Sequence, residues 1–261
     1  MKVTQGFFNI DGVALEYQQY RPAEPLDLTL VLLHEGLGCV AMWKDFPYQL
    51  ASLTGCRVLV YSRAGYGGSD PCLLPRPLSF MHDEALRVLP KILLAADITS
   101  AVLIGHSDGA SIALINAGGV ADPRVHGLVL LAPHVFVEEL TLASIRDAKS
   151  AYESTDLRER LNRYHGDNVD CAFLGWNQAW LDPGFRNWNL ETYLPKLSVP
   201  VLLIQGEQDN YGTIRQLETI TAQLPQSAEM VLLPDCGHSP FRDQPQATLR
   251  LLGDFIAKLL P

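Results

Sequence analysis

The chain has 261 residues, of which 48% are hydrophobic and 19% charged, a composition typical of a globular protein with a sizeable core. Its formal net charge of −9 argues against a surface that binds nucleic acid or an anionic membrane. No apolar leader and no run of about 18 apolar residues is present, and the five cysteines include no Cys-x-x-Cys pair. We therefore expect a cytoplasmic protein with free thiols, no metal site and no organic cofactor.

The first two elements form a hairpin pattern, because residues 7–10 and 13–17 flank an Asp-Gly turn. Short apolar runs then alternate with segments of helical period at 83–94, 214–224 and 246–259. This alternation predicts a mainly parallel sheet with helices on both faces. The runs expected to form its parallel strands are 28–33, 58–61, 101–104, 128–131, 201–204 and 230–233.

The alternation stops between residues 134 and 190. No strand pattern occurs there, residues 137–152 and 157–164 have helical composition, and three of the four tryptophans fall in this segment. A small helical insert with large aromatic residues is expected to cover a pocket at the carboxyl ends of the strands, so we interpret it as a lid. The alternative is a set of extra helices packed on the surface. Trp176 and Trp180 are expected to line the pocket.

The segment Gly105-His106-Ser107-Asp108-Gly109 follows one apolar run and leads directly into a helical pattern. Gly-x-Ser-x-Gly between a strand and a helix is typical of a nucleophile elbow, in which the serine has a strained backbone conformation. The two glycines remove Cβ atoms that would clash in the turn. The helix that follows places Ser107 at the positive end of its dipole. Ser107 is therefore the predicted nucleophile.

A serine hydroxyl reacts only when a base takes its proton, and the base needs an orienting partner. Asp209 follows the run 201–204, and His238 follows the run 230–233 and a glycine. We assign His238 as the base and Asp209 as the acid, because both stand at the carboxyl end of a strand. Asp235 is too close in sequence to reach the far nitrogen of His238. The other competing carboxylates are Glu138 and Glu139.

An acyl transfer also requires backbone N–H groups that face the oxygen on which negative charge develops. The residue after the nucleophile, Asp108, is expected to supply one of them. The glycine-containing loop after the run 28–33 is expected to supply the other, and Gly36 is the predicted donor, with Glu35 and Leu37 as neighbouring alternatives.

Together these motifs resemble the α/β-hydrolase superfamily over essentially the whole chain. Residues 34–38 (His-Glu-Gly-Leu-Gly) look like its His-Gly oxyanion motif, and residues 62–69 (Ser-Arg-Ala-Gly-Tyr-Gly-Gly-Ser) like its Asp-x-x-Gly-x-Gly-x-Ser loop. The resemblance implies an α/β-hydrolase fold: a mainly parallel eight-stranded sheet with helices on both faces and a small helical lid. Residues 1–133 and 191–261 then form the core, and residues 134–190 the lid.

Three residues depart from the family pattern. Glu35 stands where a glycine is usual, Ser62 where an aspartate is usual, and Asp108 where a neutral residue is frequent. A carboxylate that faced the oxyanion would oppose catalysis, so we expect Glu35 and Asp108 to turn away from it and pair with Arg63. A weaker alternative is that they select a cationic group on the substrate, and Glu35 is kept as a candidate pocket residue.

The expected activity is hydrolysis of a carboxylic ester of a small molecule through an acyl-serine, with Ser107, His238 and Asp209 as the catalytic residues. The same residues would serve a carbon–carbon bond hydrolase of a ring-cleavage product, a thioesterase or an enzyme similar to proline iminopeptidase, because the pocket decides among these activities. A protein that only binds a ligand on a hydrolase scaffold is the alternative outside enzymes.

Overall fold

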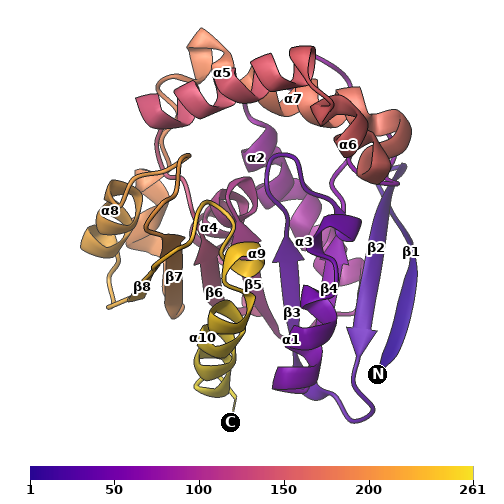
Figure 1. Ribbon diagram of the computed structural model, residues 1–261. Helices are drawn as coiled ribbons and strands as arrows, with labels where there is room; N and C mark the ends of the chain where they lie inside the picture. Colours follow the sequence, from indigo (N-terminus) through magenta and orange to yellow (C-terminus); the bar gives the residue numbers. More distant parts are fainter. Residues whose placement is uncertain (261) are drawn as a thin grey trace.

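Eight strands form one sheet in the order β1-β2-β4-β3-β5-β6-β7-β8, in a computed structural model that describes residues 1–260 (Figure 1). The hairpin β1–β2 and the pair β2–β4 are antiparallel, and all other neighbours are parallel. The predicted hairpin and the six predicted parallel strands are confirmed. The strands are β1 Lys2–Ile10, β2 Val13–Arg21, β3 Leu26–Leu33, β4 Cys56–Tyr61, β5 Ala101–His106, β6 Val125–Leu131, β7 Val201–Gly206 and β8 Glu229–Leu233.

Helices cover both faces of this sheet, as the alternating pattern predicts. Leu30 and Leu32 of β3 pack in one apolar core with α1 and α10, whereas Val31 and Leu33 pack in a second core with α3, α4 and α8. This division follows from the alternation of side chains along a strand. The helices outside the segment 134–190 are α1 Phe46–Thr54, α2 Phe80–Asp83, α3 Leu89–Ala95, α4 Asp108–Gly119, α8 Arg215–Gln223, α9 Pro240–Asp243 and α10 Pro245–Ala257.

The helix predicted over 83–94 is interrupted. The structure has α2, then a π-helical turn at Glu84–Val88, and then α3. Pro90 lies in the first turn of α3 and has no N–H to donate to the carbonyl four residues earlier, so a regular α-helix cannot continue through it.

Residues 134–190, called here the helical segment, lie across the carboxyl ends of the parallel strands (Figure 1). Their two ends meet at an antiparallel bridge between Phe136 and Asn189 and a 2.7 Å bond from Leu190 N–H to the Val135 carbonyl. The segment contains α5 Glu139–Ser154, α6 Leu157–His165 and α7 Val169–Leu181. The sequence pattern predicts the first two helices. It does not predict α7, because aromatic residues obscure the helical period there.

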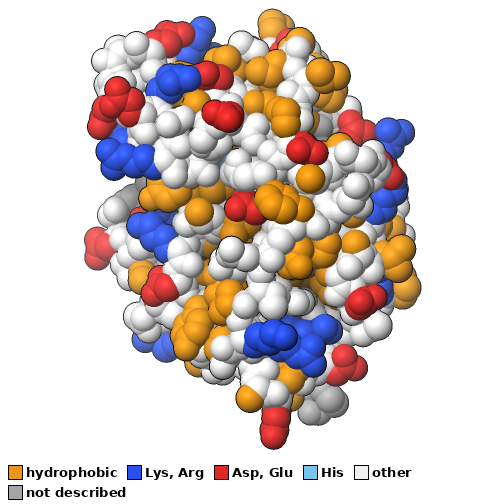
Figure 2. Space-filling model, turned by 90° about the vertical axis from the view of Figure 1, so that its right-hand side faces the viewer, with side chains coloured by type: hydrophobic (Ala, Val, Ile, Leu, Met, Phe, Trp, Pro, Cys, Tyr) orange, Lys and Arg blue, Asp and Glu red, His pale blue; other side chains and the backbone are white. Residues whose placement is uncertain are grey.

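One edge of the sheet is β8, and the other is the hairpin strand β1, which exposes Val3 and Phe7. Figure 2 shows the side of the molecule that lies at this edge, and acidic and basic side chains are intermixed over the helices at its top. Among residues 1–260, no helix has the length and apolar character needed to cross a membrane.

Gly109, in the first turn of α4, brings this helix against the end of β3. A Cβ on Gly109 would overlap the carbonyl oxygen of Leu33, which is backbone and cannot rotate away. We predict that Gly109→Ala lowers the free energy of unfolding by about 3 kcal/mol, measured by urea denaturation. Gly12→Asn is the matched control, because nothing lies near that turn position and asparagine tolerates its positive φ. Equal stability of the two variants would contradict this packing argument.

Candidate active site

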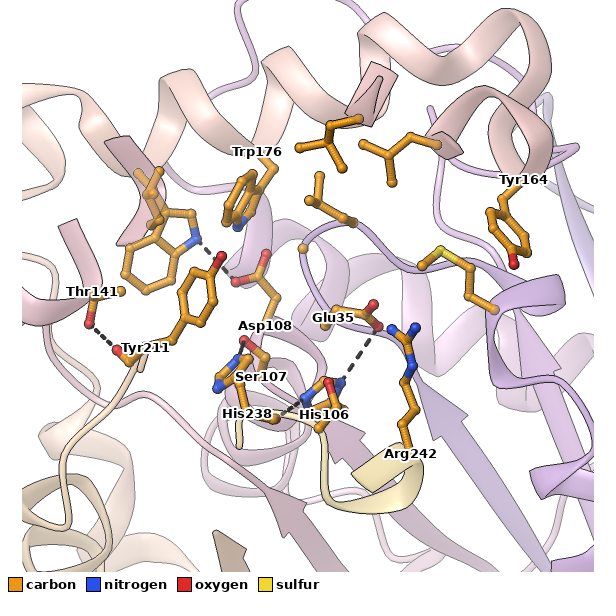
Figure 3. A pocket seen from close by; sticks show the side chains of 18 of the residues that line it. Glu35, His106, Ser107, Asp108, Thr141, Tyr164, Trp176, Tyr211, His238 and Arg242 are labelled. Atoms are coloured by element: carbon orange, nitrogen blue, oxygen red, sulfur yellow. Dashed lines mark hydrogen bonds and ion pairs between the residues drawn. The ribbon is translucent and has the colours of Figure 1, made fainter. Parts of the chain in front are cut away.

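The sharp turn predicted at Ser107 is present between β5 and α4 (Figure 3). Ser107 has φ 52° and ψ −116°, a backbone conformation that residues with a Cβ rarely adopt. Its N–H donates to the Leu131 carbonyl at 2.9 Å, and its own carbonyl accepts from the N–H of Ala110 at 2.9 Å. These bonds hold the strained residue between β6 and the first turn of α4.

The structure brings His238 and Asp209 to Ser107. His238 Nε2 lies 2.9 Å from Ser107 Oγ, and His238 Nδ1 lies 2.8 Å and 3.0 Å from the two carboxylate oxygens of Asp209. Since an ionised carboxylate can only accept, Nδ1 carries the proton and Nε2 is free to accept from the serine hydroxyl. The geometry is that of a nucleophile, a base and an orienting acid.

Asp209 is held by donors from its own loop and from β7. The backbone N–H groups of Tyr211 and Gly212 donate to its Oδ1 at 2.8 Å and 3.2 Å, and the Gln205 amide donates to Oδ2 at 3.1 Å. Burial alone would raise the pKa of Asp209, but the bond and charge of His238 and the Tyr211 N–H together lower it. The carboxylate therefore stays ionised while it is almost fully removed from solvent.

Ser107 and His238 line a cavity of about 420 Å³, and Asp209 contacts it only through His238. Five other residues singled out from the sequence line the same cavity: Glu35, Gly36, Asp108, Trp176 and Trp180. The structure thus brings together every predicted site residue. No group of three or more histidine, cysteine, aspartate or glutamate side chains within residues 1–260 is arranged to hold a metal ion.

A family model described as "Alpha/beta hydrolase family" matches residues 30–251, from β3 into α10. The chain belongs to the alpha/beta hydrolase family. The strand order, the turn at Ser107 and the position of the helical segment are then features of a hydrolase.

Named relatives of this hydrolase are distant. The probable lysophospholipase L2 of Haemophilus influenzae is 22% identical, over 85% of this chain and 81% of the relative. The proline iminopeptidase of Saccharolobus solfataricus is 21% identical, over 98% of this chain and 93% of the relative. Among solved structures, a putative lipase of Acinetobacter baumannii has a TM-score of 0.78 and 18% identity, covering 98% of this chain and 92% of that one. The last likeness shows a shared fold.

The expectation that Arg63 pairs with both acidic residues is correct for only one of them. Arg63 Nη2 lies 3.9 Å from Asp108 Oδ2, and both side chains are buried. The carboxylate of Glu35 makes no ion pair with Arg63, because the guanidinium donates instead to the backbone carbonyls of His34 and Glu35 at 2.6 Å and 2.9 Å. Arg63 thus fixes the backbone of the loop that carries Glu35.

The Glu35 carboxylate faces His106 rather than an arginine, with Oε2 3.6 Å from His106 Nδ1 (Figure 3). Burial would raise the pKa of Glu35, but the contact with His106 and the nearby His34 lower it to about 2. His106 Nε2 donates to the backbone carbonyl of His238 at 2.7 Å. Glu35 and His106 therefore form a chain of contacts that positions the loop of His238.

Both predicted pocket tryptophans come from α7 and contact the residues expected to form the oxyanion hole. The indole N–H of Trp180 donates to Asp108 Oδ1 at 3.1 Å, and Asp108 Oδ2 has no hydrogen-bond partner among the described residues. Burial raises the pKa of Asp108, although Arg63 and Trp180 oppose this shift. The ring of Trp176 lies so close to Gly36 that a Cβ there would overlap it, which explains why this loop position requires glycine.

Two further residues next to His238 were not predicted as part of the site. The rings of Tyr211 and His134 lie 4.7 Å and 5.6 Å from the His238 ring, measured between centroids, and both line the cavity. Tyr211 stands two residues after Asp209, in the loop that follows β7, and this place in the sequence could have indicated that it lies near the site. His134 could have been found in the same way, because it lies in the loop that follows β6.

His134 makes folding sensitive to acid. Burial, followed by the charge of His238, lowers the pKa of His134 to about 3, so the folded protein keeps it neutral. In the unfolded chain a histidine takes up a proton near pH 6.5, and the unfolded state then binds more protons. The stabilisation is complete above that pH and is lost progressively as the pH falls toward 3.

We predict that the free energy of unfolding, measured by urea titration at pH 7 and pH 5, falls less in His134→Gln than in the wild type. His126→Gln is the matched control, because His126 is exposed on β6. The same decrease in all three proteins would contradict the assignment.

Proposed function

We propose that this hydrolase cleaves a carboxylic ester of a small molecule through an acyl-serine intermediate. The observation that carries the proposal is the unbroken hydrogen-bond chain from Ser107 through His238 to Asp209 at the wall of a partly open, largely apolar cavity. A protein that merely binds a ligand on this scaffold has no need of a base held within 2.9 Å of a serine hydroxyl.

In the proposed reaction, His238 Nε2 takes the proton of Ser107 as its oxygen attacks the ester carbonyl. The backbone N–H groups of Gly36 and Asp108 bind the oxygen that becomes negative, and Asp209 stabilises the imidazolium. His238 then returns the proton to the leaving alcohol, and an acyl-serine remains. Water, deprotonated by the same histidine, releases the acid and restores Ser107.

The surroundings of the cavity support an ester with an apolar acyl part. Leu37, Ile145 and Leu161 contribute apolar side chains near the tryptophans of α7, whereas Arg163 and Arg242 stand on the lining as exposed cations. The names of two relatives, a lysophospholipase and a putative lipase, are consistent with ester substrates.

We also propose that residues 134–190 act as a lid on a core formed by 1–133 and 191–261. The proposal is supported by the bridge that closes the ends of the segment and by the two tryptophans that α7 contributes to the cavity. Movement of α7 would open the site to substrate and exclude water on closing.

The first test compares the wild type with Ser107→Ala on a panel of p-nitrophenyl esters, thioesters and vinylogous diketones. We predict that the wild type prefers the esters and that kcat/KM falls at least about 10³-fold in the variant, because the nucleophile is gone. Ser150→Ala, on the exposed face of α5, is the matched control and retains full activity. Equal ester turnover by Ser107→Ala, with its melting temperature unchanged, would refute the proposed nucleophile.

A second candidate activity is hydrolysis of an amide whose substrate carries a free amino or imino group. It is favoured by one observation: the ionised carboxylate of Glu35 lines the cavity and makes no ion pair with an arginine or lysine among residues 1–260. One relative is a proline iminopeptidase.

The two activities are separated by Glu35→Gln. If Glu35 binds a cationic amine, KM for proline p-nitroanilide rises in this variant about 10-fold more than KM for p-nitrophenyl acetate, because any effect through His106 on the His238 loop is common to both substrates. Failure of the wild type to hydrolyse proline p-nitroanilide would eliminate the second candidate and leave the esterase proposal standing.

A further inference from the structure

Two cysteines that are 99 positions apart meet where the helical segment contacts the core. Cys72 lies in the loop between β4 and α2, and Cys171 lies in the first turn of α7. Their sulfur atoms are 2.9 Å apart. The Cys72 N–H donates to the Cys171 sulfur at 3.4 Å, and the Cys171 S–H is 3.4 Å from the Cys72 carbonyl. The two residues thus share three contacts across the junction.

These cysteines differ from the others in their surroundings. Cys72 and Cys171 are partly exposed, while the remaining three cysteines are buried. Arg76 donates from Nη2 to the Cys72 sulfur at 3.2 Å, and its guanidinium is fixed over the rings of Tyr66 and Phe80. A negative charge that develops on the Cys72 sulfur is therefore met by an immobile cation, which is the environment of a reactive cysteine.

The site also has room for a bond between the sulfur atoms. Gly65, with φ +82°, faces the pair, and a Cβ there would lie 2.7 Å from the Cys171 sulfur and 2.8 Å from the Cys72 sulfur. Only a bare backbone leaves space for both sulfur atoms. A disulfide has an S–S length of about 2.0 Å, so its formation requires each sulfur to move by less than about 1 Å.

We propose that Cys72 and Cys171 are a redox modification site that a hydroperoxide converts to a reversible disulfide, which ties the start of α7 to the loop between β4 and α2. This inference does not depend on the proposed esterase activity.

The reaction balances with hydrogen peroxide as the oxidant. The Cys72 sulfur attacks one peroxide oxygen, the O–O bond breaks, Cys72 becomes a sulfenic acid, and the other oxygen leaves as water with the thiol proton. The Cys171 sulfur then attacks the Cys72 sulfur, the S–O bond breaks, and a second water leaves with the Cys171 proton. Burial raises the pKa of the Cys171 thiol, whereas the Cys72 sulfur accepts from Arg76, so Cys72 is the residue that reacts first with the peroxide. A dithiol reverses the change by thiol–disulfide exchange.

The bond would act on a helix that forms part of the cavity. α7 carries Trp176 and Trp180, and its start is docked by Asn168, whose side-chain amide donates to the carbonyls of Gly67 and Ser69 at 3.1 Å and 2.6 Å. The disulfide adds a covalent link beside these bonds and keeps the docked geometry. Opening of α7 away from the core is then restrained in the oxidised protein.

The test treats the reduced full-length protein with hydrogen peroxide, alkylates the remaining thiols and maps the peptides by mass spectrometry. The expected result is a cross-linked Cys72–Cys171 peptide that dithiothreitol removes, with the three buried cysteines still alkylated after unfolding. The melting temperature of the oxidised form rises by roughly 5 °C, because the link restricts the unfolded chain. Absence of this peptide, or cross-links spread over other cysteines, would overturn the proposal.

Matched variants distinguish oxidation of Cys72 and Cys171 from oxidation of the other cysteines. Cys171→Ser leaves a dimedone-reactive sulfenic acid on Cys72 and abolishes the rise in melting temperature, whereas Cys56→Ser retains both the cross-link and the rise. Hydrogen exchange of the α7 amides is slower in the oxidised wild type than in the reduced form. If α7 exchanges at the same rate in both forms, the disulfide does not restrain the helix and the proposed tie is wrong.

Discussion

The close approach of the turn at Ser107 to the end of β3 is the constraint on which the rest of the site depends. Gly109 lies against the Leu33 carbonyl, and a Cβ on Gly105 would overlap the backbone of Gly109 and Ala110 in the first turn of α4. These contacts hold Ser107 at a positive φ, where its hydroxyl points to His238. The strain is maintained by neighbouring backbone, so the Ser107 side chain, which we propose as the nucleophile, is already in position in the free protein.

The acidic residues beside the serine follow from the same packing. Asp108 is the first residue of α4, and Trp180 from α7 and Arg63 contact its carboxylate. Glu35 has a different role, since its contact with His106 leads on to the backbone carbonyl of His238. The helical segment thus holds the Asp108 carboxylate, whereas the loop after β3 contacts the loop of His238 through His106.

Much of this arrangement could be predicted from the sequence, because each predicted strand is a short apolar run and the Gly-x-Ser-x-Gly turn has its own spacing. The order of Ser107, Asp209 and His238 also follows from which strands they terminate. α7 and the pairing of Glu35 with His106 could not be predicted. The helical period of α7 is hidden among aromatic residues, and the Glu35 pairing joins the loop after β3 to a histidine at the end of β5. Such contacts are set by tertiary packing, which a local pattern does not encode.

We propose above that Ser107 is a nucleophile activated by His238. The most direct measurement is the mass of the protein after reaction with a fluorophosphonate, with the modified residue mapped by peptide sequencing. We predict a single phosphonyl group on Ser107 in the wild type and labelling at least about 10²-fold slower in His238→Ala. A wild-type protein that takes up no label, or takes it up at another residue, would contradict the assignment of Ser107 as the nucleophile.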